Sequence, residues 1–234
     1  MSWNQSSPYT PASVSDERVT SFLAKVYLWM FVGLLITSGT AYVVAYTPAL
    51  VETFILNRFL FWILLFAQLG LVWFLSARIS TMSPTVAAGM FMLYSGLVGV
   101  TTSVILLAYT ASSIASTFVI TAGMFGVTAL LGTITKRSLA GVGQFMFMGL
   151  IGLILASIVN IFVQSSLVYF VISVVGIIVF TGLTAWDAQR LKHMAIALPE
   201  GQLNSYAVVG ALSLYLDFIN LFFMLLRLTG GRRN

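Results

Sequence analysis

Seven runs of apolar residues, separated by short polar or proline-containing segments, set the pattern of this chain. Each run is about twenty residues long, the length that an α-helix needs to cross the hydrocarbon core of a bilayer. The runs are continuous rather than alternating, so they predict helices and not the strands of a membrane barrel. We expect them at 27–46, 59–77, 85–109, 113–135, 139–163, 167–186 and 206–226, the sixth helix continuing in amphipathic form toward residue 198.

Composition supports a membrane protein. Hydrophobic residues make up 59% of the 234 residues and charged residues only 7%, whereas soluble domains carry about 25% charged residues. The predicted fold class is therefore all-α, a polytopic membrane protein whose main partner is the lipid bilayer. The chain contains no cysteine, which excludes disulfides and thiolate chemistry. The net charge of +5 comes from basic residues scattered in loops and tails, so we expect no nucleic-acid partner.

The N-terminal segment differs from the rest. Residues 1–22 are polar and lack the positive start and short apolar stretch of a secretory signal. We expect 1–22 to be a mostly disordered cytoplasmic tail, and 23–234 to form one seven-helix transmembrane domain.

Basic residues predict the orientation, because lysine and arginine in short loops favour the cytoplasmic side. With seven spans, the side of the N-terminus collects Arg18, Lys25, Arg78, Lys136, Arg137, Arg190 and Lys192, and the other side Arg58, Arg227, Arg232 and Arg233. We therefore expect a cytoplasmic N-terminus and an external C-terminus. If the last run were instead a re-entrant hairpin, both ends would be cytoplasmic.

The seventh run carries a polar stripe. Gly210, Ser213, Asp217 and Asn220 fall at i, i+3, i+7 and i+10, and Arg227 continues the same helical face. An ionised aspartate at mid-membrane costs roughly 2.5–3.5 kcal/mol on insertion scales, so such a stripe faces other helices or a wet cavity. We expect the seventh helix to be central to the bundle.

Two carboxylates, Asp187 and Asp217, lie in or beside apolar runs. The turn between the last two helices falls at 199–202, midway between them, so an antiparallel hairpin places both at equal depth. Two carboxylates in contact there cannot both ionise at low cost. They would share a proton, bind a cation or pair with an arginine, for which Arg78 at the end of the second run is the candidate.

The segments 211–222, reading ALSLYLDFINLF, and 184–192, reading TAWDAQRLK, carry a family resemblance. They are similar to the signatures of the Bax inhibitor-1, or transmembrane Bax-inhibitor-motif, family, and the likeness extends over all seven spans toward its YccA/YbhL-type bacterial branch. The resemblance implies six helices around a central seventh, in the bacterial inner membrane. It also implies a pH-sensitive calcium leak with Asp187 and Asp217 as sensor and gate, capped by Arg78.

Two positions depart from the family pattern. Trp186 replaces the usual tyrosine and removes a hydroxyl beside Asp187. Gln68 stands in the region where some relatives carry a carboxylate, so we expect Arg227 to lack an ionic partner.

The first functional hypothesis is a pH-sensitive leak channel for cations, calcium above all. Asp187 and Asp217, supported by Ser213 and Asn220, offer the oxygen ligands that calcium prefers, but two carboxylates make only a weak site. No cofactor is expected beyond transient calcium. The alternative is a regulator without transport that binds other membrane proteins, such as a membrane protease or a stress-response factor. Enzymatic activity is not expected, because the glycines of an intramembrane aspartyl protease motif are missing before Asp217 and the single histidine leaves no triad.

Overall fold

The computed structural model describes residues 11–78 and 81–233, and nearly all of them are helical. Seven helices are long and apolar enough to cross a membrane, and no β-strand occurs in the described ranges. The all-α prediction is thus confirmed. The elements are α1 (Pro11–Ala45), α2 (Pro48–Leu50), the π-helical turn η1 (Val51–Leu56), α3 (Arg58–Arg78), α4 (Pro84–Ala108), α5 (Ala111–Ile134), α6 (Ala140–Val163), α7 (Ser166–Ala197), the 3₁₀ turn η3 (Glu200–Gln202) and α8 (Leu203–Thr229).

Several helices begin where the sequence supplies a hydroxyl cap. Ser83, Thr110 and Ser165 each accept a hydrogen bond from a backbone N–H in the first turn of α4, α5 and α7. Such caps satisfy N–H groups that have no partner within the helix. The loops that precede these capped helices are short, so each helix runs antiparallel to the one before it. The sequence analysis did not predict α2 and η1, which fill the connection between α1 and α3.

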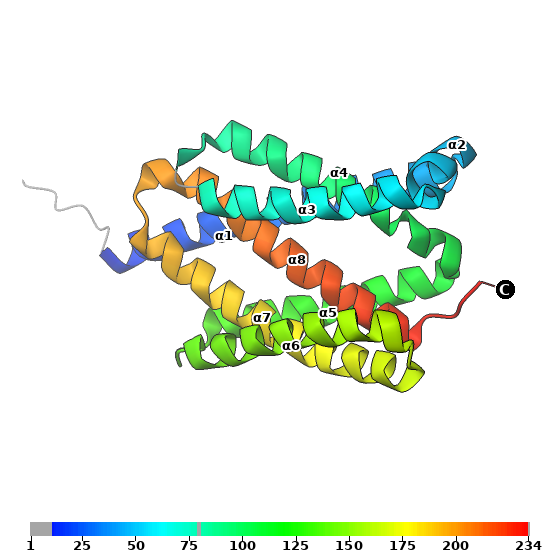
Figure 1. The fold of residues 1–234 in the computed structure, drawn as a ribbon. Helices are drawn as coiled ribbons and strands as arrows, with labels where there is room; N and C mark the ends of the chain where they lie inside the picture. The colour runs from blue at the N-terminus through cyan, green and yellow to red at the C-terminus, as the bar shows by residue number, and fades with distance from the viewer. Residues whose placement is uncertain (1–10, 79–80, 234) are drawn as a thin grey trace, which may run out of the picture.

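The last helix lies at the centre of the molecule. The most apolar window of α8 is 61% buried, against 11% to 39% for the other spans. In Figure 1, α8 runs diagonally between a group formed by α1, α3 and α4 and a group formed by α5, α6 and α7. It packs directly on α1, α4, α5 and α7, while α3 packs on α4 and α6 packs on α7. The prediction of a central helix is confirmed, with four helices in its first layer and two farther out.

The start of α1 differs from the prediction. The helix begins at Pro11 rather than after residue 22, and Val19 and Phe22 are buried at 9% and 2% exposure. The reason is their spacing with Val26, since i, i+3 and i+7 place the three on one helical face toward the core. The part of α1 that carries Val19 and Phe22 therefore packs in the bundle, and residues 1–10 of the expected tail lie outside the described residues.

The two ends of the described chain lie at opposite ends of the bundle (Figure 1). Arg18 on α1 donates a hydrogen bond to the carbonyl of Leu198, at the turn between α7 and α8. At the other end, the backbone N–H of Arg233 donates to the carbonyl of Ala108 at 2.9 Å, and that of Thr110 to Gly231 at 3.1 Å. The last helix thus crosses the whole bundle, as expected for seven full spans and not for a re-entrant hairpin.

Close packing of α5 against α7 gives a stability test. A Cβ added to Gly132 would collide with the backbone carbonyl of Ala185, whereas one added to Gly126 on the same helix meets nothing within 4 Å. Both Gly→Ala changes raise helix propensity equally, so only packing separates them. We expect Gly132→Ala to destabilise the protein by about 1–3 kcal/mol and Gly126→Ala to leave the midpoint of thermal unfolding unchanged or raised. Equal midpoints for the two variants would contradict the helix contact.

Candidate functional site

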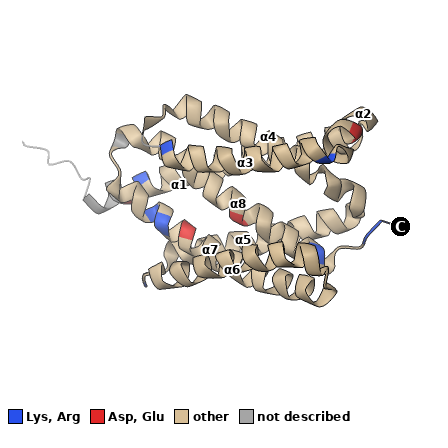
Figure 2. Ribbon diagram, viewed as in Figure 1, with Lys and Arg blue, Asp and Glu red and all other residues tan. Residues whose placement is uncertain are grey.

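Two aspartates, one on each of the paired helices α7 and α8, are buried inside the bundle. Asp187 is 7% exposed and Asp217 is 6% exposed, on helices that pack along their length. Asp187 and Arg190 are charged neighbours of Asp217. Lys and Arg gather toward the two ends of the bundle, and the acidic segments of α7 and α8 lie between them (Figure 2). The structure therefore gathers both sequence-predicted acids and one arginine into a single cluster.

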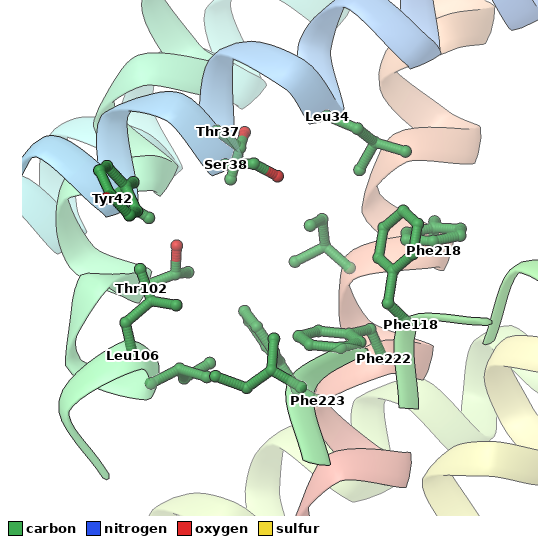
Figure 3. A pocket seen from close by; sticks show the side chains of 14 residues that line it. Leu34, Thr37, Ser38, Tyr42, Thr102, Leu106, Phe118, Phe218, Phe222 and Phe223 are labelled. Carbon is green, nitrogen blue, oxygen red and sulfur yellow. The ribbon is translucent and has the colours of Figure 1, made fainter. Parts of the chain in front are cut away.

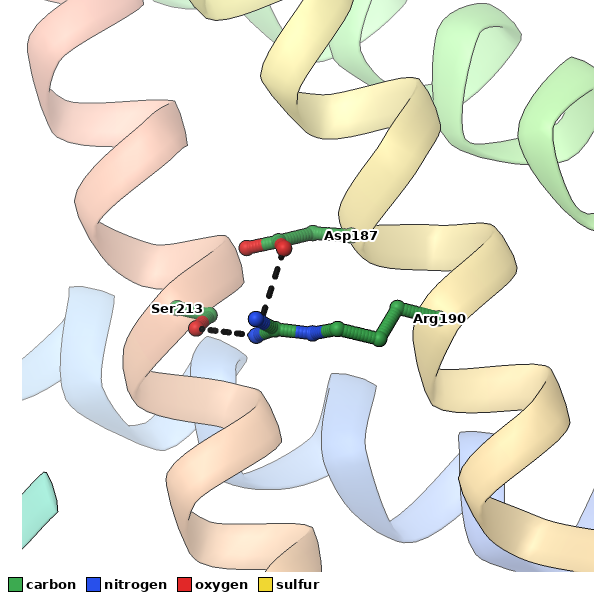
Figure 4. A network of polar contacts seen from close by, with 3 residues as sticks. All are labelled: Asp187, Arg190 and Ser213. Carbon is green, nitrogen blue, oxygen red and sulfur yellow. Dashed lines mark hydrogen bonds and ion pairs between the residues drawn. The ribbon is translucent and has the colours of Figure 1, made fainter. Parts of the chain in front are cut away.

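The arginine of this cluster is Arg190, one turn after Asp187 on α7. Its Nη2 lies 3.2 Å from Oδ1 of Asp187 and donates to the hydroxyl of Ser213 on α8 at 3.1 Å (Figure 4). Its guanidinium carbon also lies 5.0 Å from the centre of the Trp186 ring, a cation–π distance. The contact with Ser213 joins the two helices, and Arg190 is held by three different groups.

Arg78, the expected capping residue, does not occupy this place. It is the last residue of α3, its side chain is exposed, and among the described residues the one ion pair joins Arg190 to Asp187. The physical reason is reach: α3 packs on α4 and not on α8, so its end lies outside the layer of helices that contact the acids. In this structure Arg190, and not Arg78, pairs with an acid of the cluster. The sequence analysis used Arg190 only to predict the membrane orientation.

The charges of the cluster do not balance. Two carboxylates lie near one guanidinium, and two other basic side chains of this end bind elsewhere: Lys25 to Asn204 at 2.9 Å and Lys192 to the carbonyl of Thr133 at 2.8 Å. Within the described part of the chain, Oδ2 of Asp217 is buried and has no hydrogen-bond partner. A buried carboxylate oxygen without a partner is costly unless it carries a proton or contacts a cation.

The remaining predicted supporting residues lie apart from the cluster. Asn220 donates to the carbonyl of Leu216 within its own helix at 2.8 Å. Arg227 stacks over the ring of Tyr169 at 5.0 Å, so it has an aromatic rather than an ionic partner. Of the four supporting side chains named from the sequence, Ser213 alone touches the charged group.

Gln189, two residues after Asp187, has a structural role that the sequence analysis missed. It is 4% exposed, its Oε1 accepts from the backbone N–H of Leu139 at 2.7 Å, and its Nε2 donates to the carbonyls of Thr135 and Arg137 at 3.2 and 2.9 Å. One side chain thereby satisfies three backbone groups of the α5–α6 connection. The sequence did show a glutamine near Asp187 on a mostly apolar helix, which suggests a buried amide. It could not identify the hydrogen-bond partners, which lie 50 or more residues away.

An aromatic cluster lies one half-turn from Asp217 along α8. Tyr215 is fully buried, its hydroxyl lies 2.6 Å from Oγ1 of Thr37, and Thr37 donates to the carbonyl of Ser95 at 2.9 Å. The rings of Phe91 and Tyr94 meet Tyr215 edge to face, at 5.7 and 6.0 Å between centres. These contacts join α1, α4 and α8 in a dry layer.

A crevice of about 300 Å³ lies on the C-terminal side of Asp217 along α8, and Figure 3 shows the side chains that line it. Thr37 lies on its wall, so the Thr37–Tyr215 hydrogen bond forms part of its inner boundary. The wall is mostly apolar and is contributed by α1, α4, α5 and α8: Leu34, Thr37, Ser38, Ala41, Tyr42, Thr102, Ile105, Leu106, Ile114, Phe118, Phe218, Ile219, Phe222 and Phe223.

The acidic cluster offers few ligands for a cation. Across the described residues, no group of three or more histidine, cysteine, aspartate or glutamate side chains comes together. A cation at the cluster would find Asp187, Asp217 and the hydroxyl of Ser213, which are hard oxygen ligands. Two carboxylates and one hydroxyl are fewer ligands than the roughly six to eight oxygens that calcium usually takes.

Comparison with known proteins gives long matches. The family model described as inhibitor of apoptosis-promoting Bax1 matches residues 19–234. The chain is 50% identical over 216 residues to the inner membrane protein YbhL of Escherichia coli, covering 91% of this chain and 92% of that protein. It is 43% identical over 215 residues to a protein of Borreliella burgdorferi, and 35% identical over 219 residues to a membrane protein of Streptococcus pyogenes, covering 93% and 95% of those chains.

The Gln189 clamp can be tested apart from any function. Replacing Gln189 with alanine leaves three backbone groups without their partner, so we expect amide hydrogen exchange in the 135–139 segment to accelerate by about tenfold. Gln144→Ala on α6 is the matched control, because Gln144 is exposed. Exchange that is equally slow in both variants would show that the clamp does not hold this connection.

Proposed function

The chain belongs to the Bax inhibitor family, and from this premise we propose that it is a pH-sensitive cation leak of the bacterial inner membrane, with calcium as the main permeant ion. The acidic cluster of Asp187 and Asp217 is its sensor and gate. The family and the membrane helices support the location, and the chemistry of the cluster supports the function.

One observation carries the proposal: Asp217 is 6% exposed at the centre of the most buried helix, and its Oδ2 has no hydrogen-bond partner in the described part of the chain. A purely structural carboxylate would be paired fully. An unbalanced negative charge in low dielectric instead attracts either a proton or a metal cation. The same atom can therefore sense pH and bind the permeant ion.

The charge count gives the direction of the pH response. At low pH one of the two acids holds a proton, and the cluster of one carboxylate and Arg190 is neutral. As pH rises that proton leaves, and the second negative charge must be balanced. Either the carboxylates of α7 and α8 repel or a cation enters between them, and both changes favour conduction. Flux is therefore expected to increase with pH.

Two further regions adjoin the cluster. The rings of Tyr215, Phe91 and Tyr94 lie beside the acidic cluster, because Tyr215 precedes Asp217 by two residues on α8, and the crevice lies on the C-terminal side of Asp217 along that helix. A closely packed aromatic layer is a barrier to a hydrated ion. We infer that this layer closes the resting channel and that movement of α8 against α1 and α4, started at the acidic pair, breaks the Thr37–Tyr215 hydrogen bond.

Reconstitution tests the function directly. Purified protein in liposomes that enclose a calcium dye should admit calcium faster as external pH rises between about 5 and 8. Asp217→Asn keeps the shape but removes a charge and a ligand, so it should lower the flux and flatten the pH dependence. We expect a loss of about tenfold at the upper pH, the factor that corresponds to about 1.4 kcal/mol of lost cation stabilisation.

Asp187→Asn and the double variant sharpen this test. Because the two acids act as one unit, the effects of the single changes should be far from additive. Asp16→Asn, at an exposed position of α1, is the control and should behave as wild type. Absence of calcium entry in wild type at every pH would reject the leak and favour the alternative, a regulator that binds other membrane proteins without transport.

Orientation is tested separately. A reporter inserted in the 135–139 connection should be cytoplasmic, because Lys136 and Arg137 obey the positive-inside tendency. A reporter fused after Asn234 should be periplasmic, since α8 crosses the full bundle. A cytoplasmic signal from both fusions would contradict the proposed orientation.

A further inference from the structure

The side chain of Arg190 is directed into the bundle, whereas a residue that only sets membrane orientation would extend to water. An arginine near the end of a membrane helix ordinarily extends its side chain outward to water. Here the side chain extends from α7 across to α8, so that Nη2 lies 3.2 Å from Oδ1 of Asp187 and 3.1 Å from Oγ of Ser213 (Figure 4). The guanidinium thus sits among the oxygen atoms that would surround a metal cation.

Its two oxygen contacts are the contacts that calcium would make. Asp187 and Ser213 offer hard oxygens, and the nearby Asp217 adds an unpartnered, buried carboxylate oxygen. One Arg190 nitrogen touches the first two together. A tethered monovalent cation therefore occupies the place of a free divalent one, and both cannot be there at once.

The arginine is held loosely enough to leave. Its side chain is 41% exposed, against 10% for that of Asp187. Among the described residues Nε of Arg190 has no hydrogen-bond partner, so the group is kept in place by Nη2 and by the Trp186 ring. Rotation of a long side chain that already reaches the surface requires no movement of a helix.

No other charged side chain of the described residues replaces it. Around the cluster, Lys25 and Arg18 of α1 bind Asn204 and the carbonyl of Leu198, and Lys192 of α7 binds the carbonyl of Thr133. Arg190 makes the one ion pair with the acids.

We propose that Arg190 is a built-in competitor for the cation site: its guanidinium occupies the oxygen cluster of Asp187, Ser213 and Asp217 at rest, and a divalent cation binds only when it swings out. This inference rests on the proposed function, because it names what regulates access to the same site. It assigns Arg190 a positioning and blocking role and not a ligand role.

The test is a binding measurement that needs no transport. Terbium(III) substitutes for calcium and emits when excited through a neighbouring tryptophan, and Trp186 adjoins Asp187. With purified protein at constant pH, Arg190→Gln should lower the terbium concentration for half-saturation by about tenfold, as expected when one competing charge leaves a partly buried site. Added calcium should displace the terbium from this variant.

Three controls make the measurement specific. Lys192→Gln removes the same charge from the same helix without touching the acids and should bind as wild type. Adding Asp217→Asn to Arg190→Gln should abolish the gain, and Trp186→Phe should abolish the emission. Arg190→Met, neutral and of similar length, repeats the test if the glutamine variant does not fold.

The outcomes separate this inference from the proposed function. Unchanged or weaker terbium binding in both neutral Arg190 variants would overturn the competitor role and leave Arg190 as a brace between α7 and α8. Tighter binding without calcium flux in any variant would support the competitor and reject the leak. Flux in wild type together with unchanged binding in the Arg190 variants would do the reverse.

Discussion

The architecture depends on the need to place a carboxylate inside a membrane. Asp217 cannot face lipid, because an ionised group there lacks the water or partner that compensates it. The helix that carries it therefore lies at the centre, where α1, α4, α5 and α7 cover it on all sides. Close approach is possible because Gly210 of α8 lies against Leu191 and Val26, where even a methyl group would collide. The outer helices α3 and α6 carry apolar residues to the lipid.

The polarity of the bundle interior changes from one end of α8 to the other. At the end that holds the N-terminus, long side chains bind backbone carbonyls across helices, as Arg18 does with Leu198 and Lys192 with Thr133. The acidic cluster and the rings around Tyr215 follow at similar depth, and the apolar crevice comes after them. The charged groups thus lie between the basic end of the bundle and the apolar crevice. A change of charge in the cluster acts first on α7 and α8, whose contact is bridged there by Arg190 and Ser213.

Much of the fold was predictable because membrane helices can be identified in a sequence by their length and apolar composition. Periodicity along 206–226 predicted that α8 is central, since a polar stripe on an apolar helix has only one favourable direction to face. The start of α1 was missed because the exposed Asp16 and Glu17 make this segment polar on average, although Val19 and Phe22 form an apolar face. The Gln189 clamp could not be predicted either, because its partners are backbone groups, and these carry no signature in the side-chain sequence.

The choice between Arg78 and Arg190 shows the limit of charge patterns. Both residues lie on the side rich in lysine and arginine, and a count of charges treats them alike. Spacing contains the missing information: Arg190 stands at i+3 from Asp187 on one helix, so the two can pair whatever the rest of the bundle does. Arg78 needs α3 to approach α8, and α3 packs on α4 instead. A pair on one helix has a further consequence, because breaking it separates no helices. Release of Arg190 from Asp187 therefore needs rotation of one side chain and no movement of α7 or α8.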